Sequence, residues 1–568
     1  MPNNSPEPWS ISIGNWGGYA PSYFDNSYSF YGNKNQATTT TDVDIRDPNV
    51  LTQGPGVVAL TSGTQEGELG SNLIVGITKH ALSSNAAYAC GAASVFKITS
   101  TAVSNSNFPK TITAGTANVS TDVLIYQGKV LVFWNDTGVD GDIGLLTNDT
   151  TWDDDWGSTA ATGKAQLQDA PHYGIVGWGN SSSETAFITN GRYIATVTDT
   201  TLDPIALTFF ADAKIVSVTW NWNRVVIAMN RPNVTGSNYN LSGIYKWNGV
   251  SSNPEGDPIE VGGEIGALYT KNGTTYVWWK DAITTGGYNF GYLTSSEGRL
   301  ELIRRYSGSL PNQAQVGDYD GFIGWISSNK LVLWGSKDKD VPVSLFRFMS
   351  GEYGTVGTWA APFGTPLISS EKSADFTAAT NDVITCATHG LSNTDTVRLT
   401  TTTTLPAGLS AATTYYVVSA TTSTFKLSLT SGGDPIDITG TGTGTHTWHR
   451  YSIAKASGYS VGARYNTMAY PMRSPGWKCQ IDLIQLGFET LASGAKVDTT
   501  ITYNQGASTL ALDQVAYSAS DTSTFKKIYN GGLQCDDFRI DFSWANGSTS
   551  NPVKIRTLLM KGTWIQNN

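Results

Sequence analysis

The chain has 568 residues, of which only 14% are charged, whereas glycine (60 residues) and aromatic residues (11%) are frequent. This composition favours β-structure with many turns, and the length corresponds to about three or four domains. No apolar run reaches the roughly 18 residues of a transmembrane helix. The start, MPNNSPEPW, has neither the basic nor the apolar segment of a secretion signal, so we expect a soluble intracellular protein. The net charge of −10, without any basic block, argues against nucleic-acid binding along the whole chain.

A repeat of about fifty residues occupies much of the chain. Short apolar strands recur at intervals of 47 to 54 residues, each with an aromatic or aliphatic anchor: Phe96, Leu145, Tyr193, Tyr245, Tyr292 and Phe346. A hairpin precedes each anchor strand, with turns such as QGK, NWN, KNG and SNK that supply the Asn and Gly needed for positive φ. A polar loop and, in most units, a fourth strand follow.

Six such units predict an all-β fold in which residues 51–370 form a β-propeller of six or seven four-stranded blades. A single four-stranded sheet cannot bury both faces, whereas a ring of sheets can. Small residues in the inner strands suit the close approach of backbones near a propeller axis; these are Gly76, Gly174, Gly177, Gly266 and Gly324. A solenoid and a tandem of sandwiches are the alternatives.

Residues 1–50 are aromatic and polar without sustained alternation, which predicts an extended N-terminal arm. Five aromatic residues cluster in it: Tyr23, Phe24, Tyr28, Phe30 and Tyr31. Because water disfavours such a cluster, we expect the arm to be buried, either against a partner subunit or against the chain's own propeller.

From about residue 371 the composition shifts to Thr, Ser, Ala and Gly in short alternating runs, which predicts an inserted β-module over 371–450. The blocks HGLSNTDTVRL, LPAGLSAATTYYVVSATTSTFKLSLTSGG and TGTGTHTW, in this order, resemble a β-module that recurs in virion proteins of tailed bacteriophages, especially tail fibres and other tail parts. The resemblance implies membership of a phage particle and no chemistry. It also makes His389 and His446 recurring module positions with a hydrogen-bonding, structural role. Since the module interrupts the surrounding sequence, we expect it in an exposed loop.

Residues 451–568 contain alternating strands separated by Gly, Ser and Asn turns, which predicts a C-terminal antiparallel β-sandwich. The order of arm, propeller, inserted module and sandwich is similar to that of propeller-containing tail-tip or nozzle proteins of short-tailed phages. This second resemblance lies in the architecture, and a fold alone does not determine a function.

The four cysteines are scattered without a C-x-x-C spacing, so neighbouring cysteines form neither a zinc ribbon nor a redox motif. We expect each of Cys90, Cys386, Cys479 and Cys535 to be a free, half-buried thiol. Cys479 and Cys535 could meet within the last domain, although an intracellular origin lowers the expectation of a disulfide.

Propellers host sialidases and other glycosidases, but the blades here lack Ser-x-Asp-x-Gly-x-Thr-Trp turns. Acidic residues that could hydrolyse a glycoside as a carboxylate pair occur in two runs: Asp136, Asp140, Asp142, Asp153, Asp154 and Asp155. The run 458–462 matches the G-x-S-x-G nucleophile elbow, but no histidine follows His449 and no helical pattern follows the serine, so we interpret the match as accidental. We assign no catalytic residue and no cofactor.

Two arrangements could bind a metal ion. His446 and His449, three residues apart, could share one only with a further ligand from elsewhere. Asp136, Asp140 and Asp142 lie among glycines and could hold Ca²⁺, but they lack the spacing and terminal Glu of an EF-hand; an acidic turn is the commoner explanation. The metal assignment stays open.

Tryptophan is frequent in the blade strands and their turns: Trp134, Trp178, Trp220, Trp222, Trp247, Trp278, Trp279, Trp325 and Trp334. We expect most of them to pack between blades. Trp220 and Trp222 flank a turn, where an outward-facing indole could stack on a sugar ring.

The sequence therefore favours a non-enzymatic, structural virion protein located in the tail of a tailed phage and made in the bacterial cytoplasm. Its partners would be further copies of itself in a ring, with six-fold symmetry as one option, and other tail proteins. At the tail end it would help to form the DNA exit channel, where a mildly acidic lining repels passing phosphates. The alternatives are a receptor-binding tail fibre or adhesin that recognises host surface glycan, and a propeller glycosidase.

Overall fold

The computed structural model describes most of the chain. The described residues are 6–14, 16, 37–41, 43–44, 49–60, 74–78, 81–82, 85–99, 102–104, 106–115, 118–136, 138–160, 167–170, 173–179, 183–231, 242–271, 273–281, 287–296, 298–307, 310, 318–319, 322–327, 330–335, 344–347, 359–360, 367–411, 413–467, 469–470, 477–545 and 547–566. In this part of the chain, no helix combines the length and hydropathy that a membrane span requires.

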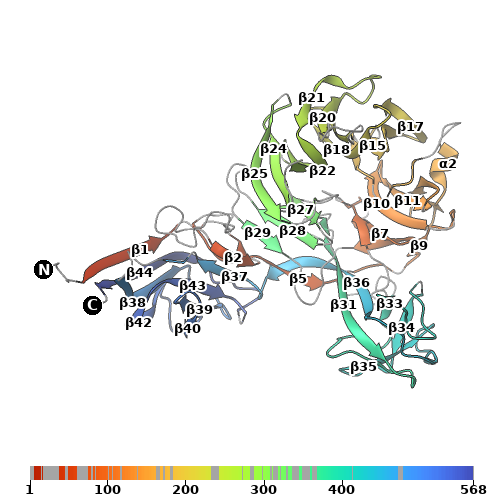
Figure 1. The fold of residues 1–568 in the computed structure, drawn as a ribbon. Coiled ribbons are helices and arrows are strands. Elements are labelled where there is room, and N and C mark those ends of the chain that lie inside the picture. Colours follow the sequence, from red (N-terminus) through yellow and green to blue (C-terminus); the bar gives the residue numbers. More distant parts are fainter. Residues whose placement is uncertain are drawn as a thin grey trace.

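Six four-stranded antiparallel sheets succeed one another and form the propeller, which confirms the predicted fold with six blades among the described residues (Figure 1). Within each blade the strands pair in chain order. The blades are β6–β9 (Ile74–Ile77, Ala86–Gly91, Ser94–Thr99, Lys110–Thr111), β10–β13 (Asn118–Tyr126, Lys129–Asp136, Asp140–Leu146, Trp152–Asp153), β14–β17 (Ile175–Trp178, Thr185–Asn190, Tyr193–Thr198, Thr201–Thr208), β18–β21 (Lys214–Asn221, Arg224–Asn230, Ser242–Trp247, Glu255–Val261), β22–β25 (Gly263–Lys271, Thr274–Asp281, Gly287–Leu293, Leu300–Ser307) and β26–β29 (Asp318–Tyr319, Phe322–Ser327, Lys330–Gly335, Ser344–Arg347). One short helix, α2 (Trp156–Ala160), follows β13.

The sequence repeat coincides with the blades. The first five anchor residues lie in the third strand of successive blades, and the sixth, Phe346, lies in β29 because β26 adds a strand before the last hairpin. The predicted tight turns have the expected backbone: φ is positive at Gln127 and Gly128, and again at Trp222 and Asn223. Two consecutive positive φ angles define the type I′ hairpin turn.

Among the described residues, four apolar clusters of the propeller are each shared by two neighbouring blades, and a fifth consists of buried residues of the fifth blade. One cluster joins Phe133 and Ile143 of the second blade to Ile188 and Val197 of the third. Similar clusters join the third blade to the fourth and the fourth to the fifth. A blade therefore buries its second face only when the next blade is present, and this packing fixes the circular arrangement.

The first strands of adjacent blades approach closely at a repeated β-bulge. In four blades the pairing of the first strand with the second shifts by one residue, just before Gly76, Asp122, Ser217 and Ala267. A Cβ atom added to Gly76 would lie 2.9 Å from the Cα atom of Asp122 on the next blade. Gly76 is thus required because two backbones meet there, as the sequence predicted for the inner strands.

We predict that Gly76→Ala destabilises the protein by about 1–3 kcal/mol, because the added methyl group must push the first two blades apart. Gly262→Ala is the matched control, since its Cβ would meet no atom within 4 Å. Urea unfolding of both variants measures the difference, and equal midpoints would contradict the close-approach explanation.

The C-terminal sandwich includes strands from both ends of the chain. One sheet has the order β1-β44-β38-β42, and the other has the order β2-β37-β43-β39-β40 with β41 paired to β39. The first sheet consists of β1 (Glu7–Ile13), β44 (Ile555–Gln566), β38 (Trp477–Phe488) and β42 (Phe525–Cys535). The second consists of β2 (Ala37–Thr41), β37 (Arg464–Thr467), β43 (Phe538–Ser543), β39 (Lys496–Tyr503), β40 (Ser508–Ala511) and β41 (Val515–Ala516), and the two-residue strands β3 (Val43–Asp44) and β4 (Thr52–Gln53) pair nearby.

The described strands of the N-terminal segment pair with this sandwich, whereas the sequence predicted burial against a partner subunit or the propeller; β2 and β3 also lie close to β29 of the propeller. β1 pairs with β44 and β2 with β37. The physical reason is a short alternation in EPWSISI, where Trp9, Ile11 and Ile13 pack on the sandwich core. The aromatic cluster predicted between Tyr23 and Tyr31 lies outside the described residues.

A long antiparallel ribbon joins the inserted module to the other parts. The eight-stranded sheet has the order β30-β31-β32-β35-β34-β33-β36-β5, with a further pairing of β31 and β36. Its strands are β30 (Trp359–Ala360), β31 (Leu367–Ala378), β32 (Ile384–Thr385), β35 (Thr424–Ser428), β34 (Tyr415–Val418), β33 (Thr396–Thr401), β36 (His446–Tyr459) and β5 (Pro55–Ala59). The module has its own buried core, which includes Val397, Phe425 and Trp448, and it projects from the ribbon in Figure 1.

Candidate functional site

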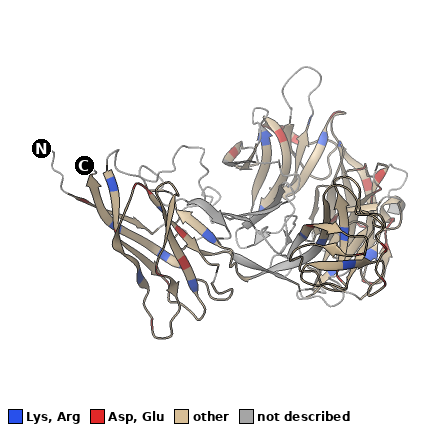
Figure 2. Ribbon diagram, turned by 60° about the horizontal axis from the view of Figure 1, so that its bottom comes forward, with Lys and Arg blue, Asp and Glu red and all other residues tan. Residues whose placement is uncertain are grey.

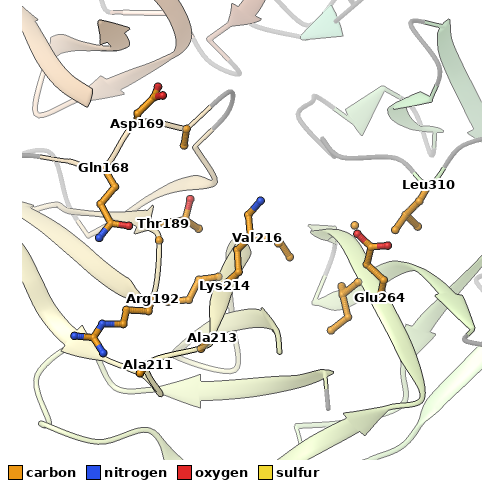
Figure 3. Close-up of a pocket in the computed structure, with 15 residues that line it drawn as sticks. Gln168, Asp169, Thr189, Arg192, Ala211, Ala213, Lys214, Val216, Glu264 and Leu310 are labelled. Atoms are coloured by element: carbon orange, nitrogen blue, oxygen red, sulfur yellow. The ribbon is translucent and has the colours of Figure 1, made fainter. Parts of the chain in front are cut away.

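A pocket of about 600 Å³ opens where the first strands of the third, fourth and fifth blades begin. Its lining comes from the segments that lead into first strands, from the first residues of β18 and β22, and from the end of β15 with the turn after it. The labelled lining residues in Figure 3 are Gln168, Asp169, Thr189, Arg192, Ala211, Ala213, Lys214, Val216, Glu264 and Leu310. Because strands alternate in direction within a blade, these segments and the turns after the second strands share one face of the propeller.

Asparagine side chains at the ends of three second strands hold these connecting segments in place. Asn230, at the end of β19, donates to the carbonyl of Ile265 (2.7 Å) and accepts from its N–H (2.9 Å). Asn190, at the end of β15, accepts from the N–H of Gln168 (2.7 Å). Asn135, near the end of β11, accepts from the hydroxyl of Tyr173 (2.6 Å). Asn135 and Asn190 therefore both hold the connection before β14, and Asn230 holds the start of β22.

Sequence reasoning missed this asparagine series. Each asparagine directly follows an apolar second strand, as in VLVFWN, TAFITN and VVIAMN. The apolar anchors and the turns define the repeat, and this polar position belongs to neither. An alignment of the repeats on their hairpins would have revealed it.

The pocket contains charges of both signs. Lys214 and Glu264 are exposed within it, and Glu264 lies on the opposite side from Gln168 and Arg192 in Figure 3. The Arg192 Nε donates to the Tyr193 hydroxyl (2.8 Å), and its guanidinium lies over the Tyr193 ring. A carboxylate oxygen of Asp169 accepts from the N–H of Gly138 (3.0 Å) on the second blade. Such a lining fits a neutral polar ligand better than a strongly charged one.

Charge is also sparse elsewhere on the molecule. Figure 2 shows blue and red segments mixed along a ribbon that is mostly uncharged, which agrees with the 14% of charged residues. On the described ribbon of this view, Lys and Arg positions do not gather in one region.

The structure brings together several of the predicted acidic residues beside the second blade. Asp142 is 2% exposed, and its carboxyl accepts from the hydroxyl of Ser158 (2.8 Å) and the N–H of Ile143 (2.6 Å). Burial and a hydrogen bond with Asp155 raise the pKa of Asp142 to about 7. Burial, together with the charges of Asp136 and its acidic neighbours, also raises the pKa of Asp140. The Asp142 carboxyl, through its bond to Ser158, holds α2 against β12.

We predict that Asp142 makes the protein more stable at acid than at alkaline pH. Its pKa is raised in the folded state, so its contribution is complete below about pH 4 and is lost as the pH rises through about 7. Asp142→Asn should reduce this loss, by about 1–3 kcal/mol between pH 5 and 8, because an amide does not ionise.

Urea unfolding at both pH values measures the effect, with Asp153→Asn as the exposed control. An Asp142→Asn variant that keeps the full pH dependence of the native chain would exclude Asp142 as its source.

The other predicted acidic residues accept hydrogen bonds from different partners. Asp153 is exposed, and its carboxylate accepts from the N–H of Asp155 (3.3 Å). Asp154 binds the N–H and the hydroxyl of Thr113. Across the described residues, no group of three His, Cys, Asp or Glu side chains is arranged to hold a metal ion, so the Ca²⁺ arrangement of Asp136, Asp140 and Asp142 is not formed.

The histidine candidates are structural. Residues three apart on a strand face opposite sides of the sheet, which separates His446 from His449. His446 bonds through Nδ1 to Thr401 Oγ1 (2.9 Å), and His449 through Nε2 to Thr400 Oγ1 (2.7 Å). His389 Nδ1 accepts from the N–H of Leu391 (3.0 Å). The predicted hydrogen-bonding role of His389 and His446 is confirmed.

The G-x-S-x-G run ends a strand and does not begin a helix. Gly458 belongs to β36, and Ser460 lies in the following turn, where its N–H donates to the carbonyl of Gly54 (2.8 Å) and its Oγ accepts from the N–H of Gly462 (3.1 Å). The next element is strand β37. A nucleophile elbow requires a strand-to-helix turn, so the match is accidental, as predicted.

Four of the seven predicted blade tryptophans whose side chains are described are buried, Trp220 and Trp222 are half-buried, and Trp178 is exposed. Trp134, Trp247, Trp278 and Trp279 belong to the core. Trp178 is 49% exposed and stacks on Trp220 of the next blade, with ring centroids 4.6 Å apart and an interplanar angle of 13°. Trp325 and Trp334 lie in β27 and β28, and their side chains fall outside the described part.

No protein-family model matches the sequence. No curated protein matches it either.

Several solved structures are similar to the chain. The YCF48 protein of Cyanidioschyzon merolae is 10% identical, covers 53% of this chain and 93% of its own, and gives a TM-score of 0.35. The computationally designed Ika8 protein is 12% identical, with coverages of 58% and 86% and a TM-score of 0.31. An exo-β-1,3-galactanase of Phanerochaete chrysosporium is 8% identical, with coverages of 70% and 97% and a TM-score of 0.28. Scores this low carry no information about activity.

Proposed function

We propose that the protein is a structural component of the tail of a tailed bacteriophage, of the tail-tip or nozzle type. In this role the propeller is a rigid body, the sandwich provides contacts between copies, and no reaction is catalysed. The observation that carries the proposal is the inserted module, whose sequence blocks resemble a β-module of phage tail proteins and whose residues form a separate unit with its own core.

The way in which the module is attached supports this assignment. β31 and β36 pair continuously from Leu367 with Lys455 to Phe376 with His446, and then enter the module core. An insertion on a two-stranded ribbon leaves the remaining fold undisturbed, which suits an exposed accessory unit of a particle.

The sandwich offers edges for a ring of identical copies. β1 and β42 are the two ends of one described sheet, and strand direction alternates across it. β42 of one copy next to β1 of another would continue this alternation, because the two strands would again be antiparallel. Such a contact is head-to-tail, and head-to-tail contacts generate a ring where the rotation between copies closes and a filament where it does not. The residue Phe525 at the start of β42 is 61% exposed and would be covered by it.

In a ring around an exit channel, the net charge of −10 would reduce adhesion of passing DNA, because like charges repel phosphates. This contribution is electrostatic and needs no base contact.

We predict that the purified chain assembles, with increasing concentration, into a closed ring of six or twelve copies. Light scattering coupled to gel filtration gives the mass directly. Deletion of residues 6–14 is expected to prevent assembly, since it removes β1 and leaves β42 without its proposed partner.

A stable trimer would contradict the ring and favour a fibre or adhesin that binds host glycan. The stacked Trp178 and Trp220 are the specific observation behind that second function, since an exposed indole can stack on a sugar ring. A monomer at every concentration would also contradict self-assembly.

A further inference from the structure

Two of the four cysteines face each other across neighbouring strands of the sandwich. Cys479 of β38 is the direct partner of Cys535 of β42, followed by the pair Gln480 and Gln534. Both cysteine residues are 1% exposed, and both are reduced in this structure. The sequence predicted half-buried thiols, whereas all four cysteines are fully buried.

The register places these thiols within the geometry of a disulfide. Directly opposed residues of an antiparallel pair have Cα atoms about 4.5–5.5 Å apart, and disulfides join Cα atoms about 4.4–6.8 Å apart. A hydrogen bond between the two thiols, followed by burial, raises the pKa of Cys479. The two sulfurs are therefore already neighbours.

The other two cysteines have different surroundings. Cys90 of β7 pairs with Val95 and Gly76 inside the propeller. Cys386 accepts from the indole N–H of Trp448 (3.4 Å) inside the inserted module. Neither has a cysteine opposite it.

We propose that Cys479 and Cys535 are a disulfide-forming site, oxidised by a small-molecule disulfide such as oxidised glutathione. The inference does not depend on the proposed function, since it rests on the strand register alone.

The exchange proceeds in two balanced steps. One cysteine thiolate attacks a sulfur of oxidised glutathione, forming a mixed disulfide and releasing one glutathione thiolate. The second cysteine thiolate attacks the protein sulfur of the mixed disulfide and releases the other glutathione. The two protons of the cysteines pass to the two released thiolates; the protein loses two electrons and the glutathione disulfide gains them.

The position of Cys535 determines how the oxidant reaches the pair. Cys535 is the last residue of β42, which ends its sheet, and the flanking Gln534 and Asp536 are exposed. Because the thiols are buried and thiolates are disfavoured, oxidation should be slow in the closed fold and faster when the end of β42 opens.

The test incubates the reduced full-length chain with oxidised glutathione, with and without urea below the unfolding transition. We expect an intramolecular disulfide, seen as loss of two hydrogen atoms in the intact mass, and a peptide map that joins the segments containing Cys479 and Cys535. The disulfide closes a loop of roughly 55 residues and should raise the melting temperature by about 5–10 °C relative to the reduced chain.

Two variants separate the pair from the other cysteines. Cys90→Ala/Cys386→Ala should still form the disulfide, whereas Cys535→Ala should yield only a single glutathione adduct on Cys479. Stable mixed disulfides without the internal bond, a bond that involves Cys90 or Cys386, or no reaction in either condition would overturn the proposal. Peptide mapping of the native chain decides the question even if a variant fails to fold.

Discussion

The backbone pairing of strand β36 holds the three parts of the molecule together. Its first residues pair with β33 inside the module, residues 446–455 pair with β31, and its last residues pair with β5, which precedes the propeller. The next residue, Ser460, bonds to Gly54, and Leu51 pairs with Ile555 of the sandwich. Backbone hydrogen bonds of β36 and of the segment 51–59 thus connect the module, the chain before the propeller and the sandwich, and no single side-chain truncation removes them. The N- and C-terminal strands close the same structure at its other end, where both chain ends lie together in Figure 1.

Inside the propeller, apolar packing and side-chain hydrogen bonds have different roles. Clusters shared between blades supply the burial that no blade achieves alone, while asparagines at the strand ends fix the connections between blades. The asparagines hold part of the pocket wall, because the lining residues Gln168 and Ile265 are hydrogen-bonded to Asn190 and Asn230. The buried Asp142 has a different role. Its carboxyl, whose pKa is raised, holds a short helix against a blade by a hydrogen bond.

The sequence predicted what depends on local periodicity. The structural role of His389 and His446 was implied by the resemblance to a phage-tail module. Hairpin turns, blade strands and the small residues near the axis were readable, since each follows from a residue and its near neighbours. Pairings between distant segments were not: β1 meets β44 across almost the whole chain, and nothing in EPWSISI identifies that partner. The asparagines recur at the ends of the second strands, but the apolar residues that define the repeat do not indicate them. The exposed face of Trp178 depends on how two blades stack, which no single strand reveals.

The central claim is that this chain forms part of a tail end, with its propellers arranged around a passage for DNA. Electron cryo-microscopy of the assembled protein tests this most directly. The account predicts a closed ring in which sandwiches contact one another through β1 and β42 and the propellers border a central lumen. Propellers on the outside of the particle, with no contact to the lumen, would contradict it.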